Sequence, residues 1–317
     1  VMKILYNSAI KSHNPASEAD GTYRVNGFVE SVSLEELDLL RPLAERLIKT
    51  VHTPRYIKKI KGACMSRCEL AEVRLTPASY EAMIVSAVLS IMATRDGSFA
   101  ITRPPGHHAS REKAEGFCFL NNIAIAISYF LEQRQRVCVI DFDGHHGNGT
   151  QSIFKNDDRV LFASIHQHGV YPYTGLAQDV GKGQSHRKVI NIPVPAGSGD
   201  DVFLKALSFI VEEAKAFAPD SVAVSAGFDG YAKDSLLNLK YTKHGYHEAG
   251  RVISSIGKPV FAVLEGGYHT EVKSCVEAFV AGISEECFIT EEIPSTSSEM
   301  CMKATDHVLK EISLLLK

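Results

Sequence analysis

The sequence has no excess of basic charge. Its 317 residues include 34 Lys and Arg against 37 Asp and Glu, for a formal net charge of −3. Because a phosphate-binding surface normally shows as a basic excess or stripe, this balance argues against nucleic acid as a direct partner. The short basic run at residues 55–61 is interleaved with apolar residues at helical spacing, which indicates a solvated helix face.

A cysteine-dense segment and a long apolar run are also missing. The 7 cysteines are scattered, which favours reduced thiols and a cytoplasmic location. Cys64 and Cys68 have no second pair nearby, whereas a closed structural zinc site needs four ligands. We find no apolar run of about 18 residues, the length that spans a bilayer, and no signal peptide, so no membrane association is expected.

Short apolar runs alternate with helical patterns along the chain. The runs are residues 2–6, 99–102, 137–142, 160–166, 189–194, 222–225 and 260–264. Their continuous hydrophobicity is typical of buried parallel strands. Helical patterns between them, such as the one that begins at Pro77 after Thr76, predict an α/β fold: an open, mostly parallel sheet with helices on both faces. Ligands of such sheets bind outside the carboxyl ends of the strands.

The domain organisation is predicted to be simple. We find no internal repeat and no long linker, so residues 1–317 are expected to form a single domain. The acidic, Ser/Thr-rich stretch 284–298 is expected to be a surface connection into a last helix at about 303–316, packed on that domain.

Acidic and imidazole side chains follow two of the predicted strands. In extended backbone Asp141, Asp143 and His145 alternate by two and project from the same side, so two of them can share a metal ion. Asp229 follows the strand at 222–225 and supplies a third ligand. Asp143, His145 and Asp229 would leave a fourth position for water, as in a catalytic zinc site. The alternative is a glycine-rich turn that caps the next helix, with Asp229 an ordinary turn residue.

Two further strand ends carry candidate catalytic groups. His107 and His108 follow two prolines that fix the approach of the loop, and imidazole suits proton transfer near neutral pH. Tyr268 follows Gly266 and Gly267, and its hydroxyl could hydrogen-bond an oxyanion. The alternatives are surface histidines and an ordinary half-buried tyrosine.

Five motifs in one order give the sequence a family resemblance. They are RPPGHH at 103–108, GFCFLNN at 116–122, DFDGHHGNG at 141–149, AGFDG at 226–230 and LEGGY at 264–268. With them the chain resembles, from about residue 3 to 283, the histone deacetylase superfamily. That superfamily includes acetylpolyamine amidohydrolases and acetoin-utilisation proteins and shares an arginase-like fold. The resemblance implies a zinc-dependent deacetylase, a C–N hydrolase that removes an acetyl or short acyl group from acyl-lysine or an acetylpolyamine.

The resemblance also implies a role for each catalytic residue. Asp143, His145 and Asp229 would bind zinc, with iron as the alternative metal. His107 and His108 would flank the attacking water, with His108 as the general base. Asp141 would orient His107, and Asn148 would contact His108, as in the class II-like branch of the family. Because Asn148 is neutral, we expect His108 to be the more easily deprotonated of the pair. Tyr268 and the zinc would hold the oxyanion.

Substrate and cation sites are implied in the same way. Gly116, Phe117, Tyr171 and Gly266 match positions around the acyl-amine stem, with Phe117 and Tyr171 as walls of a narrow tunnel. Structural potassium or sodium ions would use two groups of residues: Asp141, Asp143, His145 and Ser164 in one, and the main chain around Phe154, Asp157 and Val160 in the other.

The motifs leave several alternatives open. The substrate could be an acetylated polyamine, a protein acyl-lysine or another small acylated amine. Glu69 or Glu72 could meet a cationic substrate or could be ordinary surface charges. A non-hydrolytic acyl-amine-binding or sensor protein could keep the same pocket. An arginase-like dinuclear hydrolase needs more carboxylate ligands than these motifs supply. An oligomer is compatible with the sequence, which carries no signal for its size.

Overall fold

The central element of the fold is a parallel β-sheet. The computed structural model describes residues 1–14, 19–181, 183 and 186–317, which form one seven-stranded sheet in the order β1-β4-β9-β8-β5-β6-β7. Neighbouring strands are parallel. The strands are β1 Ile4–Leu5, β4 Phe99–Ala100, β5 Val137–Asp141, β6 Val160–Gln167, β7 Val189–Val194, β8 Ser221–Ala226 and β9 Val260–Leu264. Every residue of β5 to β9 is buried, as expected of a sheet covered on both faces.

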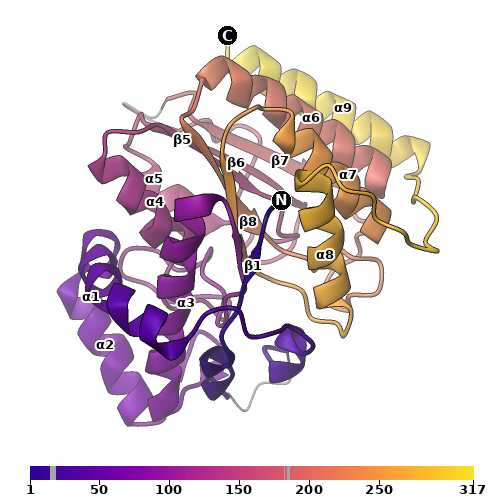
Figure 1. Cartoon of the computed structure of the whole chain (residues 1–317). Coiled ribbons are helices and arrows are strands. Elements are labelled where there is room, and N and C mark those ends of the chain that lie inside the picture. Colours follow the sequence, from indigo (N-terminus) through magenta and orange to yellow (C-terminus); the bar gives the residue numbers. More distant parts are fainter. Residues whose placement is uncertain (15–18, 182, 184–185) are drawn as a thin grey trace.

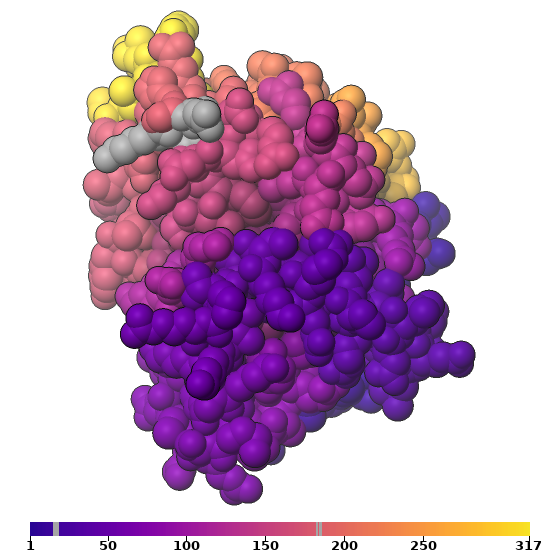
Figure 2. All heavy atoms as spheres, turned by 90° about the vertical axis from the view of Figure 1, so that its left-hand side faces the viewer, coloured from indigo at the N-terminus to yellow at the C-terminus, as the bar shows by residue number. Residues whose placement is uncertain are grey.

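Helices cover the two faces of the sheet (Figure 1). On one face α3, α4 and α5 contact the strands, and α1 and α2 pack outside them; on the other lies α6, with α7 and α9 packed against it and α8 against α7. The helices are α1 Leu34–Val51, α2 Pro54–Met65, α3 Pro77–Asp96, α4 Asn122–Glu132, α5 Asn148–Phe154, α6 Asp200–Phe217, α7 Lys243–Ser254, α8 Val272–Ile283 and α9 Glu299–Leu315, with 3-10 helices at Ser8–Ser12 and Thr22–Val25. Figure 2 shows the N-terminal helices lying against segments from the middle of the chain.

Two elements differ from the sequence prediction. Strands β2 Glu69–Leu70 and β3 Val73–Arg74 form an antiparallel hairpin that was not predicted, because two residues are too few for an alternating pattern. The last helix begins at Glu299, earlier than the predicted start near 303. Its N-cap is Ser298, whose Oγ accepts the N–H of Cys301 at 3.2 Å.

Helix α3 contradicts the expectation that no apolar segment is long enough to span a bilayer. By length and mean hydropathy it is long and apolar enough to cross a membrane. However, 67% of its apolar 18-residue stretch is buried inside the protein, and the helix contacts β4, β9, α1 and α4. Its apolar character is therefore explained by its position between the sheet and the outer helices.

A buried histidine connects the outer helices to the loop before α4. His52 Nε2 accepts the main-chain N–H of Asn121 at 3.0 Å, and the His52 ring lies 5.2 Å from the ring of Tyr56. The side chain is buried, and burial lowers the pKa of His52 to about 4. The neutral ring is thus part of the folded structure.

We expect His52 to make folding stability depend on pH. The unfolded state gains a proton near pH 6.5, whereas the folded state resists protonation down to about pH 4. The contribution of His52 is therefore fully present above pH 6.5 and is lost as the pH falls towards 4, by up to about 3 kcal/mol. His52→Gln keeps an acceptor and removes the titration, so the free energy of unfolding should fall less between about pH 7 and pH 5 in urea titrations. His307→Gln, on the exposed surface of α9, is the control. An unchanged pH slope in His52→Gln would contradict this role.

Candidate metal and catalytic centre

Four polar segments meet at the carboxyl edge of the sheet. Strands β4, β9, β8 and β5 are consecutive neighbours, and all run in the same direction. The chain that leaves them contains residues 103–108, 265–268, 227–230 and 141–149, respectively. Parallel pairing therefore brings segments from distant parts of the sequence to one place, where such sheets bind ligands.

Asp143, His145 and Asp229 lie together at this edge. One ligand-type atom from each lies within 4.8 Å of the other two. His145 Nδ1 is 2.6 Å from Asp229 Oδ2 and 3.3 Å from Asp143 Oδ1. Both carboxylates are buried. The structure thus brings the three predicted metal ligands into one cluster.

The chemistry of this cluster fits a divalent cation. Burial, with the charge of Asp143 beside it, raises the pKa of Asp229 to about 7. Two buried carboxylates at such proximity resist ionising together, and a bound cation removes that penalty. A Cβ atom on Gly266 would lie 2.5 Å from Asp143 Oδ2 and 2.9 Å from Asp229 Oδ2, so glycine leaves room for the pair. The Gly266 N–H also donates to Asp143 Oδ2 at 2.7 Å.

Asp141 lies outside this cluster, as its predicted role beside His107 requires, but the backbone from Asp141 to His145 is not extended as the sequence argument assumed. Strand β5 ends at Asp141, and the next residues turn. Asp141 Oδ1 accepts the N–H of Asp143 at 3.1 Å, and Asp143 Oδ1 accepts the N–H of His145 at 2.9 Å. In each case an Asp side chain accepts the main-chain N–H two residues later, which is an Asx-turn. The two turns bend the backbone, so Asp143 and His145 approach each other across a bend and not along a strand.

The two histidines of the pair have different surroundings. Their ring centroids are 4.1 Å apart. His107 Nδ1 is 3.0 Å from Asp141 Oδ2, and although burial opposes it, the charges of Asp143 and Asp141 raise the pKa of His107 to about 10. His108 Nδ1 is 2.7 Å from Asn148 Oδ1. Burial and the charges of His107 and His145 hold the pKa of His108 well below its usual value. One ring favours the charged form and the other the neutral form.

Glu265 is a buried carboxylate that was assigned no role from the sequence. Its Oε2 accepts the N–H groups of Gly106 and His107 at 2.7 and 3.0 Å, and its Oε1 accepts the hydroxyl of Ser225 at 3.1 Å. The side chain thus ties the end of β9 to β8 and to the histidine loop. The sequence feature that could have indicated a role is the charged side chain of Glu265 in the otherwise apolar and glycine-rich LEGGY motif.

Tyr268 is half-buried beside the cluster. Its ring lies 5.7 Å from the ring of Phe117, and the guanidinium of Arg24 stacks 4.7 Å from its centroid. Burial raises the pKa of Tyr268 well above its usual value, so the hydroxyl stays a proton donor. Arg24 is held in turn by Asp20 Oδ1 at 2.6 Å and by Gly267 O at 2.7 Å. Sequence reasoning missed Arg24, because nothing local links it to a motif more than 200 residues away.

Three of the four predicted substrate-binding residues, Gly116, Phe117 and Tyr171, form a rim beside the histidines, whereas Gly266 lies against the carboxylates of Asp143 and Asp229. Gly116 and Phe117 both have left-handed backbone, with φ of 51° and 64°, in a turn closed by main-chain bonds between Glu115 and Cys118. A Cβ atom on Gly116 would lie 2.5 Å from His108 Cδ2, so the rim needs glycine there. The ring of Tyr171 lies 5.2 Å from that of His108. The β2–β3 hairpin reaches the same rim, where Phe117 N–H donates to Ala71 O at 3.3 Å.

The residues of the predicted monovalent cation sites occupy two places. Asp141 and Ser164 face each other across β5 and β6, and Ser164 Oγ is 2.9 Å from His166 Nδ1. At the second place Phe154 O accepts the Asp157 N–H at 2.9 Å, and Asp157 O accepts the Val160 N–H at 3.3 Å. Both cation sites stay predictions.

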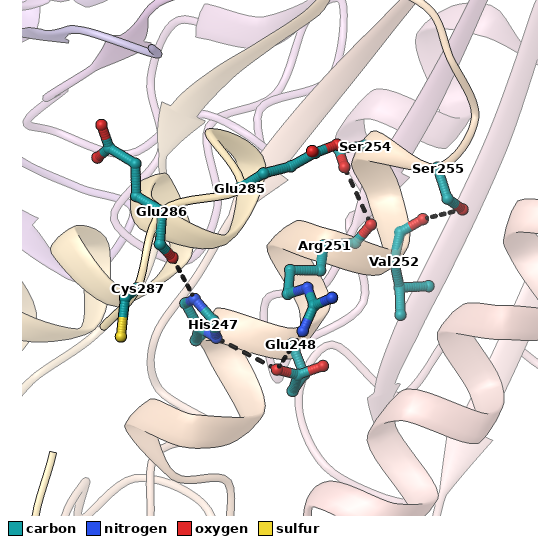
Figure 3. A pocket seen from close by; sticks show the side chains of 9 residues that line it. All are labelled: His247, Glu248, Arg251, Val252, Ser254, Ser255, Glu285, Glu286 and Cys287. Carbon is teal, nitrogen blue, oxygen red and sulfur yellow. Dashed lines mark hydrogen bonds and ion pairs between the residues drawn. The ribbon is translucent and has the colours of Figure 1, made fainter. Parts of the chain in front are cut away.

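A cleft of about 850 Å³ lies elsewhere, between α7 and the chain after α8 (Figure 3). Helix α7 connects the parallel strands β8 and β9. Its C-terminal end, which leads into β9, therefore lies towards the amino edge of the sheet. The polar groups of the cleft bond one another: His247 Nε2–H donates to Glu286 O at 2.9 Å, and Glu248 pairs with Arg251 at 3.6 Å. Neither the metal-ligand cluster nor the histidine pair lines this cleft.

The chain is similar to known proteins over most of its length. Residues 23–283 match the family model for the histone deacetylase domain. A probable deacetylase of Methanothermobacter thermautotrophicus is 39% identical over 96% of this chain and 98% of its own length. Acetylpolyamine amidohydrolase 1 of Pseudomonas aeruginosa is 40% identical over 63% of this chain and 61% of its own length.

Solved structures share the architecture. The HD domain of HDA15 superposes with a TM-score of 0.83 at 26% identity, covering 98% of this chain and 94% of that one. Acetylpolyamine aminohydrolase of Burkholderia pseudomallei has a TM-score of 0.77 at 25% identity, covering 90% and 99%. The predicted arginase-like α/β fold is thereby confirmed. From the family match, these relatives and the shared fold, we conclude that the chain belongs to the histone deacetylase family.

Proposed function

We propose that this protein is a zinc-dependent amide hydrolase that removes an acetyl or another short acyl group from an acylated amine. The observation that carries the proposal is the cluster of Asp143, His145 and Asp229 next to two histidines of opposite protonation preference. Three protein ligands leave a coordination position for water and substrate, as catalytic zinc sites do.

Asp143, His145 and Asp229 would hold the ion. When bound, zinc polarises the acyl carbonyl and lowers the pKa of water. The carboxylates and the imidazole suit zinc, and iron is the alternative for the same donor set.

The remaining residues transfer the proton, stabilise the negative charge and donate a hydrogen bond. Asn148 bonds Nδ1 of His108, so His108 takes a proton from the attacking water at Nε2 and later returns it to the leaving amine. His107 remains protonated between Asp141 and Asp143, and its charge stabilises the negative transition state. Tyr268 donates its hydroxyl hydrogen to the oxyanion.

The substrate class follows from the same site. Phe117 and Tyr171 are aromatic rings beside the catalytic groups and suit the alkyl stem of an acylated primary amine. The names of the relatives include both deacetylases and acetylpolyamine amidohydrolases. We therefore propose acyl-lysine or acetylpolyamine as the substrate.

The direct test is hydrolysis of a panel of acyl-lysine peptides and acetylpolyamines by protein of measured metal content. We expect one zinc or iron ion per chain, loss of turnover after chelation and recovery on adding zinc. Potassium is measured in the same elemental analysis. Binding of the panel without turnover by the zinc-loaded protein would instead support the acyl-amine-binding alternative. More than one divalent ion per active site would support a dinuclear hydrolase.

Tyr268→Phe should keep zinc and lose most turnover. One oxyanion donor is worth roughly 3 kcal/mol, so we expect kcat to fall about 100-fold. Tyr173→Phe is the matched control, because the Tyr173 side chain is 78% exposed and should leave kcat unchanged. If Tyr268→Phe turned over like the wild type, Tyr268 would have no part in the chemistry.

Gly266→Ala should weaken metal binding. The added Cβ would press on the oxygens of Asp143 and Asp229 and force the carboxylates apart. We expect zinc affinity, measured by competition with a chelator, to fall roughly 10- to 100-fold, as for other disturbed supports of metal ligands. Gly62→Ala is the control, since a Cβ at Gly62 in α2 meets no atom within 4 Å. Equal zinc affinity in the two variants would contradict the ligand assignment.

A further inference from the structure

The amide of Asn148 lies between His108 and a carboxylate on the rim. Asn148 Oδ1 is 2.7 Å from His108 Nδ1, and Asn148 Nδ2–H donates to Glu115 Oε2 at 3.4 Å. The other oxygen of Glu115 pairs with Lys113. One side chain is thus hydrogen-bonded at both ends, to the histidine pair and to the edge of the site.

Elementary hydrogen-bond chemistry links these contacts. An ionised carboxylate only accepts hydrogen bonds, so the group that faces Glu115 must be the NH₂ of Asn148. The carbonyl oxygen of Asn148 then faces His108, and Nδ1 of His108 must carry a hydrogen. In a neutral imidazole with hydrogen on Nδ1, Nε2 keeps its lone pair. Without Glu115 the amide could turn over, and its NH₂ would then favour the opposite tautomer of His108.

Glu115 is held where it can act in this way. Its main-chain N–H donates to Cys118 O at 3.2 Å, and its carbonyl oxygen accepts the Cys118 N–H at 2.8 Å. The turn so closed carries Gly116 and Phe117. The Glu115 side chain is 23% exposed, so solvent screens its hydrogen bond only in part. The residue is fixed by the rim turn and reaches inward to Asn148.

We propose that Glu115 is a positioning residue: it orients the amide of Asn148 and thereby selects the Nδ1–H tautomer of His108. The effect on catalysis rests on the proposed hydrolase function. The tautomer itself is a property of the resting protein, and it follows from the contacts of Asn148 with His108 and Glu115.

The tautomer can be read by nitrogen NMR of the histidines in the zinc-loaded protein. The His108 signals are assigned by their loss in His108→Gln. We expect the Nδ1–H form in the wild type and a mixture of both forms in Glu115→Ala and Glu115→Gln, because an alanine imposes no orientation and a glutamine amide both donates and accepts. Lys113→Ala, which keeps the carboxylate, is the control and should keep the wild-type tautomer. A pure Nδ1–H form in both Glu115 variants would overturn the proposal, even for a protein that hydrolysed none of the panel.

A kinetic test separates positioning from a structural role. In Glu115→Gln we expect kcat to fall roughly 5- to 10-fold, about the net value of one hydrogen bond, with KM and zinc content unchanged. In an Asn148→Asp background two carboxylates would face each other, so the same Glu115→Gln change should relieve repulsion and raise kcat or leave it unchanged. A similar fall of kcat in both backgrounds, or a change in KM alone, would show that Glu115 does not act through Asn148.

Discussion

The structure depends on the burial of two carboxylates, Asp143 and Asp229, against each other. Neighbouring parallel strands deliver them to the same edge of the sheet, and Gly266, which follows the next strand, β9, leaves room for the pair. Like charges in a buried site are unfavourable unless a cation or a proton is shared between them. The raised pKa of Asp229 expresses that cost, and His145, which contacts both carboxylates, completes a donor set that a divalent ion would satisfy.

The same electrostatics separates the two histidines. His107 lies against the acidic side of the site and is stabilised as a cation by Asp143 and Asp141. His108 is buried beside the ring of His107, 4.1 Å away, and has a neutral amide as its partner, so it prefers to be neutral. Two adjacent histidines thus differ in their preferred protonation state. The difference comes from their surroundings, with Asp143 and Asp141 beside His107 and the amide of Asn148 beside His108.

The parts of this arrangement differ in how far the sequence predicts them. The buried strands were predicted because their apolar runs have no alternation, and the fold is confirmed. The segments after β4, β5, β8 and β9 were recognisable because polar residues follow apolar strands directly, and the structure brings them together. Their roles in metal binding and catalysis remain predictions. Arg24 and Glu115 were missed because their contacts with the site are long-range and leave no local pattern. The β2–β3 hairpin was missed because it is too short for any periodicity to show.

The floor and the rim of the site are built from different kinds of segment. The floor of the site is built from strand ends, where parallel pairing fixes every neighbour and burial allows few residue types. The rim is built from the turn at Gly116 and Phe117, the β2–β3 hairpin and the loop that carries Tyr171, which are joined by single hydrogen bonds and ring contacts. Such segments accept changes at little cost in stability. If the proposed function holds, we therefore expect bond cleavage to depend on the floor and the choice among acylated amines to depend on the rim. Glu115 belongs to the rim and bonds Asn148 at the start of α5, so on the proposal above a change at Glu115 would also reach His108.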